Sequence, residues 1–278
     1  MSFYDEGDLD QAALYWKEAL AIKPESEEVR RNLEKAEKEM SLAGKMETFS
    51  TPDFDIVVYG AEIGDEELFE NTLQEIYKNT GDSLGYFPRP GTRIVIYEEK
   101  DFREVFQKSG IIRGFYDGSI RIALPEDASG ASQKVILAHE YAHAAVSALT
   151  ENRSPVWLHE GVALYEQSRY LEPGTARLKE AVKNGQLFTL SEVEGYFGSE
   201  EDYDSLALAY EAAYSAVLFI LDEWGIGGLK ELLEGIREAG HFANAFDERF
   251  YTSLTEFEKM WNDFLKKRYF GEDTSYTG

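Results

Sequence analysis

The 278-residue chain contains no cysteine. This absence excludes a disulfide framework, cysteine-based zinc sites, iron–sulfur clusters and thiol nucleophiles. Any bound metal must be held by His, Asp or Glu side chains, and histidine is itself scarce, with 4 residues. Basic residues are also few: 28 Lys and Arg stand against 53 Asp and Glu, which gives a formal net charge of −25. Because this charge repels phosphate groups, we expect neither nucleic acid nor an anionic membrane as a partner.

Long hydrophobic runs are missing as well. The longest uncharged apolar stretch, 212–221, has ten residues and ends at Asp222, so it is too short to span a membrane. The N-terminus is acidic and lacks the basic and apolar segments of a signal peptide. The sequence therefore predicts a soluble chain without a membrane span and leaves its compartment open. Hydrophobic residues make up 43% of the chain, enough for a large core.

Residues 1–46 predict a helical hairpin. Apolar residues recur at helical spacing over Leu14–Ile22, and Pro24 ends the run. The G-D-x-x-x-A turn that begins at Gly7 and the A-L-x-x-x-P segment that ends at Pro24 resemble a tetratricopeptide (TPR) repeat. Such repeats need neighbours for stability, so the resemblance implies a partial repeat, a truncated N-terminus and a protein partner for this segment. An ordinary amphipathic hairpin is the alternative.

The rest of the chain predicts an α+β domain over residues 47–278. We interpret the polar segment 41–53 as a linker and Gly114–Gly118 as a turn. The predicted strands are 54–59, 92–97 and 119–124, and the helices between them are 66–78 and 102–108. The remaining predicted helices are 133–149, 155–170, 176–184, 206–224, 229–238, 243–250 and 254–269, the last with a capping box of Ser253 and Glu256. We therefore expect a small mixed β-sheet lobe, a mainly α-helical C-terminal lobe and a frayed tail from Gly271.

The motif that carries chemistry is H-E-x-x-H at residues 139–143. Residues four apart on a helix lie about 6 Å from each other on one face, so His139 and His143 can bind one metal ion. Glu140 is placed to contact a water molecule on that ion without binding the ion itself. The alternative is two surface histidines on an amphipathic helix. The small apolar neighbours argue against it, because a buried His or Glu side chain requires a partner.

A tight zinc site needs a third protein ligand. The metzincin motif would continue with Gly and His, but Val146 and Leu149 occupy those positions. The next candidates along the chain are His159 and Glu160, on a helix for which Ser154 would be the N-cap. Spacing alone leaves both residues open as the third ligand.

The segment Trp157–Ala163, W-L-H-E-G-V-A, resembles the W-L-x-E-G-x-A segment of the gluzincin metallopeptidases, the thermolysin-like and aminopeptidase-like zinc enzymes. The resemblance covers roughly residues 54–269 and implies a thermolysin-like domain that binds one Zn²⁺ per chain. It makes Glu160 the third ligand beside His139 and His143. It leaves His159 at a variable position, at the rim of the pocket or behind a ligand.

The chain departs from the gluzincin pattern at two points. Only 16 residues separate His143 from Glu160, slightly fewer than in the best-known members. Thermolysin-like enzymes also carry an Asp four residues after the ligand Glu, where this chain has Leu164. That Asp orients the first histidine, so the corresponding partner of His139 is unassigned.

The same resemblance implies an oxyanion donor and a substrate-binding strand. Tyr210 begins a Y-E-x-x segment and aligns with the gluzincin tyrosine that binds the oxyanion, and Tyr214, one turn later, is the reserve candidate. Both could instead be core aromatics. The strand 119–124 matches the edge strand along which gluzincins bind an extended peptide through main-chain hydrogen bonds.

These observations predict a zinc-dependent peptidase in which Glu140 is the general base. An endopeptidase is favoured because the Glu-bearing edge-strand motif with which aminopeptidases bind a free N-terminus is missing. The alternative is a non-catalytic adaptor that binds peptides through the TPR-like segment and a peptidase-like domain. The intact Glu140 argues against it, because an inactive relative has no need of a general base. Substrate sequence and oligomeric state are left open.

Overall fold

The computed structural model describes residues 3–4, 6–87, 91–106, 113–125, 130–197, 203–240 and 242–271. The chain divides into two compact units that alternate along the sequence. Unit 1 comprises Met1–Gln74 and Pro88–Glu140, and unit 2 comprises Glu75–Phe87 and Tyr141–Gly278. Helices α3 (Glu66–Leu84) and α5 (Gly130–Thr150) each begin in unit 1 and continue into unit 2. The predicted domain boundary at residue 46 stays a prediction.

Unit 1 contains a mixed β-sheet, and the α+β prediction agrees with this arrangement. In the described part of the chain the sheet has five strands in the order β1-β2-β3-β5-β4. They are β1 (Met46–Ser50), β2 (Phe54–Tyr59), β3 (Thr92–Glu98), β4 (Gly114–Tyr116) and β5 (Ile120–Leu124). The three central strands are parallel, and the two outer strands, β1 and β4, pair antiparallel with their neighbours.

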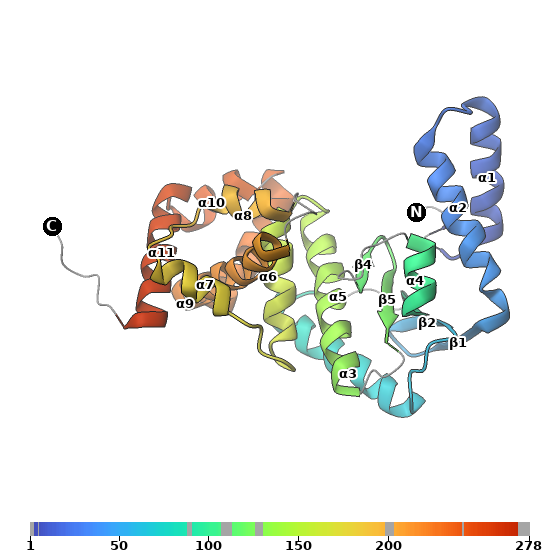
Figure 1. Cartoon of the computed structure of the whole chain (residues 1–278), viewed down its shortest axis with the longest axis horizontal. Helices are drawn as coiled ribbons and strands as arrows, with labels where there is room; N and C mark the ends of the chain where they lie inside the picture. The colour runs from blue at the N-terminus through green and yellow to red at the C-terminus, as the bar shows by residue number, and fades with distance from the viewer. Residues whose placement is uncertain are drawn as a thin grey trace. The chain divides into compact units, whose positions relative to one another are not determined.

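The central strands are apolar on both faces because both faces of the sheet are covered. On one face, Val57, Val95 and Ala123 pack with Phe102 of helix α4 (Glu99–Phe106). The alternate residues of the same strands, Ile56, Ile94 and Ile120, are equally buried on the other face. Figure 1 shows α4 on the side of the sheet away from the first turns of α5. Residues 107 and 108, at the end of the predicted helix 102–108, lie outside the described residues.

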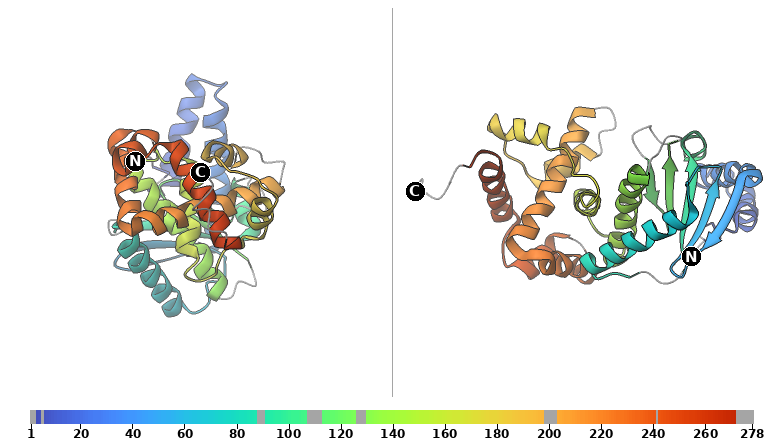
Figure 2. Two further views of the ribbon diagram at one scale, coloured as in Figure 1. Left: turned by 90° about the vertical axis from the view of Figure 1, so that its left-hand side faces the viewer. Right: turned by 90° about the horizontal axis from the view of Figure 1, so that it is seen from below.

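The N-terminal segment forms two packed helices, α1 (Leu9–Ile22) and α2 (Glu27–Ser41), as the hydrophobic spacing predicts. Asp8 caps α1, because its carboxylate accepts a hydrogen bond from the backbone N–H of Gln11 at 3.1 Å. The contact between the helices buries Ala12 and Ala36 together with Tyr4, and Trp16 packs against them. That this hairpin is a TPR repeat stays a prediction. Both views of Figure 2 show it as the blue pair of helices.

Two predictions about the sheet are wrong. The segment 41–53 is not a linker throughout, because β1 pairs with β2 from Met46↔Tyr59 to Ser50↔Asp55. Its residues are mostly exposed and polar, so hydrophobic alternation did not reveal the strand. The predicted edge strand 119–124 is instead an interior strand: β5 lies between β3 and β4, and all five of its residues are buried. In the described part of the sheet, the edge strand next to β5 is β4, which the sequence predicts as a turn.

Unit 2 is helical, as predicted for the C-terminal lobe. Its helices are α6 (Val156–Gln167), α7 (Ala176–Lys183), α8 (Leu190–Phe197), α9 (Tyr203–Ala239), α10 (Phe242–Phe250) and α11 (Leu254–Phe270), with the later parts of α3 and α5. They enclose one large core that includes Trp157 and Trp261. Ser253 caps α11 as predicted, since it accepts a hydrogen bond from Glu256 N. Helix α8 was not predicted. The predicted frayed tail begins at Gly271, which is the C-cap of α11, and the rest of it, 272–278, lies outside the described residues.

Helix α9 is the most apolar helix of unit 2. Among the described residues it alone is long and apolar enough for a membrane span. However, 56% of its most apolar stretch of 18 residues is buried inside the protein, as in the core helix of a soluble domain. At Gly225 the backbone leaves the helical region, with φ +68°, so α9 consists of two helical parts. The sequence predicted this interruption between residues 224 and 229.

Candidate metal centre

Helix α5 carries the H-E-x-x-H motif. The residues around it are small or aliphatic, and Ala138 and Ala142 are buried, so the helix packs closely on both sides of the motif. His139 and His143 keep part of their surface accessible, whereas Glu140 is 5% exposed. The helix is continuous across the motif, so its geometry places the two imidazoles one turn apart on one face.

Helix α6 carries Glu160 and is held at both of its ends. Pro155, rather than the predicted Ser154, is the N-cap, and it has no side chain to accept a hydrogen bond from the first turn. Instead, the carboxylate of Glu194 on α8 accepts hydrogen bonds from the backbone N–H groups of Val156 and Trp157, at 3.0 and 2.9 Å. A carboxylate at this position also interacts favourably with the helix dipole.

The C-terminal half of α6 is fixed by a buried carboxylate. Glu166 is 1% exposed and accepts hydrogen bonds from Thr80 and Ser83 on α3. Arg169 forms an ion pair with the same carboxylate at 3.0 Å. The charge of Glu166 is thus compensated inside the protein, which makes its burial tolerable.

The close contact between α6 and α9 explains why the W-L-x-E-G segment has a glycine, Gly161. A Cβ atom at this position would lie 2.5 Å from the carbonyl oxygen of Ala213 on α9. No ordinary side chain fits that distance, so glycine lets α6 and α9 pack backbone against backbone. Trp157 and Leu158, with 2% and 0% exposure, bury the rest of this face in the core. Glu160, next to Gly161, is thereby held in one position.

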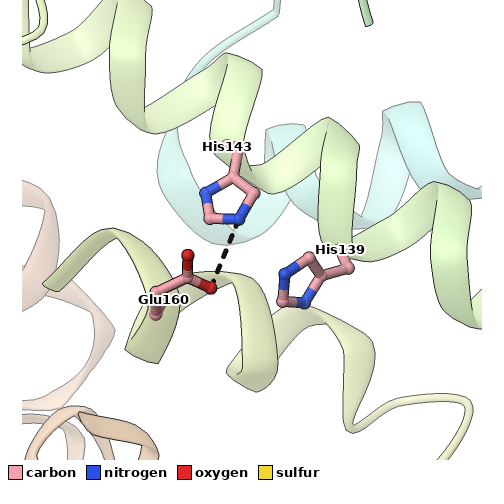
Figure 3. Close-up of side chains that lie close together, drawn as sticks. All are labelled: His139, His143 and Glu160. Atoms are coloured by element: carbon pink, nitrogen blue, oxygen red, sulfur yellow. Dashed lines mark ion pairs between the residues drawn. The ribbon is translucent and has the colours of Figure 1, made fainter. Parts of the chain in front are cut away.

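The side chains of His139, His143 and Glu160 come together (Figure 3). Each offers a ligand atom, and these atoms all lie within 4.8 Å of one another. The Nε2 atom of His143 lies 3.5 Å from Oε2 of Glu160. Two ligands of a tetrahedral zinc, each bonded at about 2.0–2.1 Å, lie roughly 3.4 Å apart. The group therefore fits one zinc ion, and two imidazoles with one carboxylate are a donor set of catalytic zinc sites.

A model of the Peptidase MA superfamily matches residues 115–267, more than half of the 278-residue chain. The chain belongs to this superfamily. A comparison with curated proteins gives no match. The segment matched to the Peptidase MA superfamily includes β5, α5 and α6 and thus all three residues of the metal-binding group. The helical hairpin and the first three strands lie outside it.

In this Peptidase MA domain, His159 contacts a residue of the metal-binding group. Its Nδ1 atom lies 3.3 Å from Nδ1 of His143, on the side of that ring away from Glu160. Burial, with His143 as a second cause, lowers the pKa of His159 to about 4, so His159 is neutral at neutral pH. A neutral His159 can accept a hydrogen bond from Nδ1–H of His143. We infer this tautomer, because Nε2 of His143, on the side of Glu160, is then the ring nitrogen that would bind a metal.

Glu140 lies against the edge strand of the sheet. A Cβ atom on Gly114 of β4 would be 2.5 Å from Cδ and 2.8 Å from Oε1 of Glu140. Glycine at this position therefore lets the carboxylate approach the β4 backbone. The sequence predicts a turn at Gly114, because a three-residue strand that begins with one glycine and is soon followed by another has the same signals as a turn.

The two candidate tyrosines have different environments. Tyr214 is 2% exposed, its hydroxyl donates a hydrogen bond to Glu172 at 3.0 Å, and burial raises its pKa to about 12. Tyr210 is half-buried, and its ring packs edge-on against Phe197 of α8 at 5.2 Å between centroids. Tyr210 lies one turn before Ala213, the residue at the closest approach of α9 to α6. Tyr214 is thus a core aromatic, and Tyr210 is the better candidate for the site.

Proposed function

We propose that this chain is a zinc-dependent peptidase of the gluzincin type. The observation that carries the proposal is the grouping of His139, His143 and Glu160 within 4.8 Å, with the buried Glu140 beside the first histidine. Membership in the Peptidase MA superfamily supports a peptidase. The two histidines and Glu160 would hold one zinc ion per chain, and His159 would orient His143 from behind.

The chemistry follows from this arrangement. When bound, zinc supplies a water molecule with a pKa near 7 and polarises the substrate carbonyl. Glu140 would accept a proton from the water that attacks the peptide carbon. The same carboxylate then donates the proton to the leaving amine, so one side chain acts first as base and then as acid. Tyr210 would donate a hydrogen bond to the oxyanion of the tetrahedral intermediate.

We place the substrate along β4 rather than along β5. An exposed edge strand can pair with an extended peptide, and β4 forms the edge of the described sheet beside Glu140. The segment 113–125 contains a single acidic residue, Asp117, whose carboxylate is bound by Lys35 and Arg121. A carboxylate ready to bind a free N-terminus is thus lacking in this segment, which favours an endopeptidase.

The proposal is tested by measuring zinc content and peptide cleavage together. The parent protein should bind one zinc and cut an unstructured polypeptide at internal bonds, and a chelator should abolish cleavage. Glu160→Ala should lower zinc affinity by more than about a hundredfold, because it removes a ligand. His159→Ala should lower it by roughly tenfold, the scale expected for a residue that only orients a ligand.

Each outcome of this test has a defined meaning. A larger loss of zinc with His159→Ala than with Glu160→Ala would transfer the third ligand to His159. One bound zinc without any cleavage of unstructured polypeptides would contradict the peptidase and favour a peptide-binding adaptor. Mass spectrometry of the products separates internal cuts from stepwise trimming and so tests the endopeptidase assignment.

Tyr210→Phe tests the oxyanion donor. If the Tyr210 hydroxyl binds the oxyanion, its removal should lower kcat by about a hundredfold and leave KM nearly unchanged, because the contact forms only in the transition state. Tyr214→Phe is the matched control. It removes a hydroxyl already bonded to Glu172, so we expect close to parental activity. Equal activity of both variants and the parent would show that Tyr210 is a core aromatic.

A further inference from the structure

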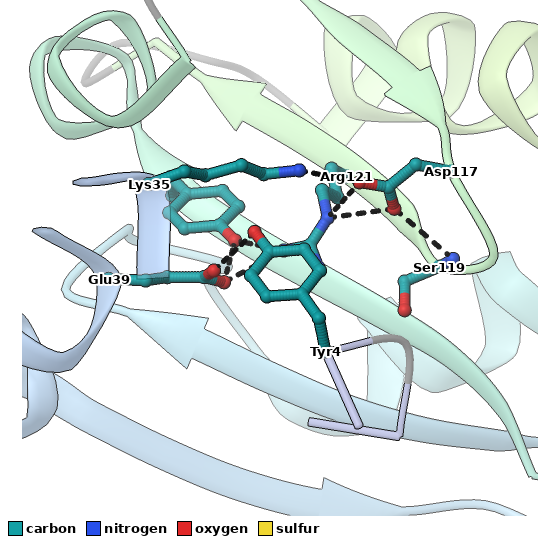
Figure 4. Close-up of polar contacts among 7 residues, drawn as sticks. Tyr4, Lys35, Glu39, Asp117, Ser119 and Arg121 are labelled. Carbon is teal, nitrogen blue, oxygen red and sulfur yellow. Dashed lines mark hydrogen bonds and ion pairs between the residues drawn. The ribbon is translucent and has the colours of Figure 1, made fainter. Parts of the chain in front are cut away.

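A buried charge network joins the N-terminal hairpin to the sheet of unit 1. We name Lys35 and Glu39 of α2, Asp117 of the β4–β5 turn and Arg121 of β5 the hairpin latch (Figure 4). Arg121 is at its centre and is 1% exposed, and Glu39 is 2% exposed. Positive and negative charges balance among the four residues. This balance makes so deep a burial of charge tolerable.

The latch contacts are short and come from distant parts of the sequence. Nη1 of Arg121 donates to Oε1 of Glu39 at 2.7 Å and to the Tyr97 hydroxyl at 2.6 Å. Nε of Arg121 donates to Asp117 at 2.9 Å, and Nζ of Lys35 donates to the other oxygen of Asp117, also at 2.9 Å. Burial alone would raise the pKa of Asp117, but the charges of Arg121 and Lys35 outweigh it and lower that pKa. Asp117 is therefore ionised and held from two sides.

The latch acts on the strand that lies against Glu140. Phe115 of β4 pairs directly with Arg121 of β5, and its ring packs against Phe106 with 4.9 Å between centroids. The ammonium group of Lys35 lies 5.7 Å from the centre of the Phe115 ring. Successive strand residues point to opposite faces, so Phe115 faces the hairpin while Gly114 faces Glu140.

A short antiparallel strand at a sheet edge is weakly held by its own hydrogen bonds. In β4, three residues pair with β5, and the turn that follows them begins with Asp117. Side chains from other elements add to these bonds: Phe106 of α4 packs on Phe115, and Lys35 of α2 reaches both the Phe115 ring and Asp117. A shift of β4 would move the pairing edge that an extended substrate uses and would change its distance from Glu140.

We propose that the N-terminal helical hairpin is a positioning element of the active site, in which Lys35 and Glu39 hold β4 in the place where it pairs with substrate. This inference rests on the proposed peptidase function. The hairpin lies outside the segment matched to the superfamily, so the inference assigns it a role that family membership does not supply. Lys35 is a positioning residue, because it acts through Asp117 and Phe115.

Lys35→Met tests the proposal, because methionine keeps most of the apolar stem and removes the charge. Lys35→Arg restores the charge. Lys17→Met is the matched control, since Lys17 forms an exposed ion pair with Glu37 on the same hairpin, with side chains 57% and 48% exposed. Two quantities are measured on the zinc-loaded full chain. They are hydrogen exchange of the β4–β5 segment and the kinetics on a long peptide and on a short one that ends beside the cleaved bond.

We expect Lys35→Met to speed exchange in β4 by about tenfold and to leave the central strands unchanged. KM for the long peptide should rise about threefold to tenfold, the scale of a lost hydrogen bond. The kcat for the long peptide, and both kcat and KM for the short peptide, should change little. Lys35→Arg should bring both the exchange rate in β4 and the KM for the long peptide most of the way back to their parental values. A general loss of stability would instead alter the exchange of the central strands and would affect both peptides equally.

Two results would overturn the inference. One is exchange in β4 that is the same in Lys35→Met as in Lys17→Met. The other is faster exchange without any change in KM for the long peptide. If the parent chain cleaves no peptide at all, the peptidase proposal fails by itself, and hydrogen exchange then decides alone whether the latch holds β4.

Discussion

Glu140→Gln should lower kcat by about two to four orders of magnitude while the protein keeps its zinc. The substitution preserves the shape of the side chain and touches none of the three residues that would bind the metal. An amide cannot accept the proton that the attacking water must lose, so the loss should fall on the chemical step. The measurement pairs steady-state kinetics on a peptide with zinc analysis of the same sample.

Glu151→Gln is the matched control for this variant. Glu151 lies just after α5 and pairs with Arg153 at 2.9 Å, with a side chain that is 55% exposed. Glu151→Gln makes the same chemical change outside the candidate site, so activity should stay at the parental level. If Glu140→Gln cleaved peptides as fast as its parent, the mechanism proposed for this chain would be wrong.

Glu39→Ala should destabilise unit 1 by roughly 3–5 kcal/mol. The substitution leaves the guanidinium of Arg121 buried, at 1% exposure, without its closest carboxylate. It also removes the acceptor of the Tyr4 and Tyr97 hydroxyls. Hydrogen exchange of amides in β3 and β5 measures the loss, because it reports the opening of unit 1 separately from unit 2.

The control is Glu37→Ala, two residues earlier on the same helix. The Glu37 side chain is 48% exposed and pairs with Lys17 at the protein surface, so we expect the stability of unit 1 to change by no more than about 0.5 kcal/mol.

Deletion of residues 1–45 removes Tyr4, Lys35 and Glu39 together and should destabilise the sheet at least as much as Glu39→Ala. If unit 1 opened no more easily after the deletion, this result would show that the hairpin folds independently and that Arg121 finds other partners.

The parts of this fold that could be predicted are those with strong local signals. Helix α5 has a continuous apolar pattern and a fixed motif, and the strands β2, β3 and β5 are runs of β-branched residues. The break in α9 was predictable because three glycines lie within Gly225–Gly228. In each case a few neighbouring residues decide the structure.

The parts that could not be predicted depend on distant residues. Strand β1 is mostly polar and exposed, and pairing with β2 makes it a strand. Glu39 has the sequence context of a solvent-facing helix residue, yet its partner Arg121 is 82 positions away. Likewise Glu194, which supports the first turn of α6, is 38 positions from Val156. A single sequence carries no mark of such pairings.

The candidate site shows the same division. The two histidines and Glu140 follow from the spacing of one motif, whereas Glu160 required a resemblance to a known segment. The role of His159 behind His143 depends on which ring nitrogen faces which neighbour, and only the packing of α5 against α6 determines that. The contact of Gly114 with Glu140 is a tertiary one, so the sequence around Gly114 does not predict it.

The length of β4 has a consequence for how tightly such an enzyme would hold its substrates. A strand of three residues can offer an extended chain only a few main-chain hydrogen bonds, each worth about 0.5–1.5 kcal/mol. That is too little for a long-lived complex, so most encounters should end in dissociation before cleavage. A folded protein, which keeps its backbone paired with itself, would rarely compete for so short an edge. Chains that are already unfolded, or loops that open often, would supply most of the bonds that are cut.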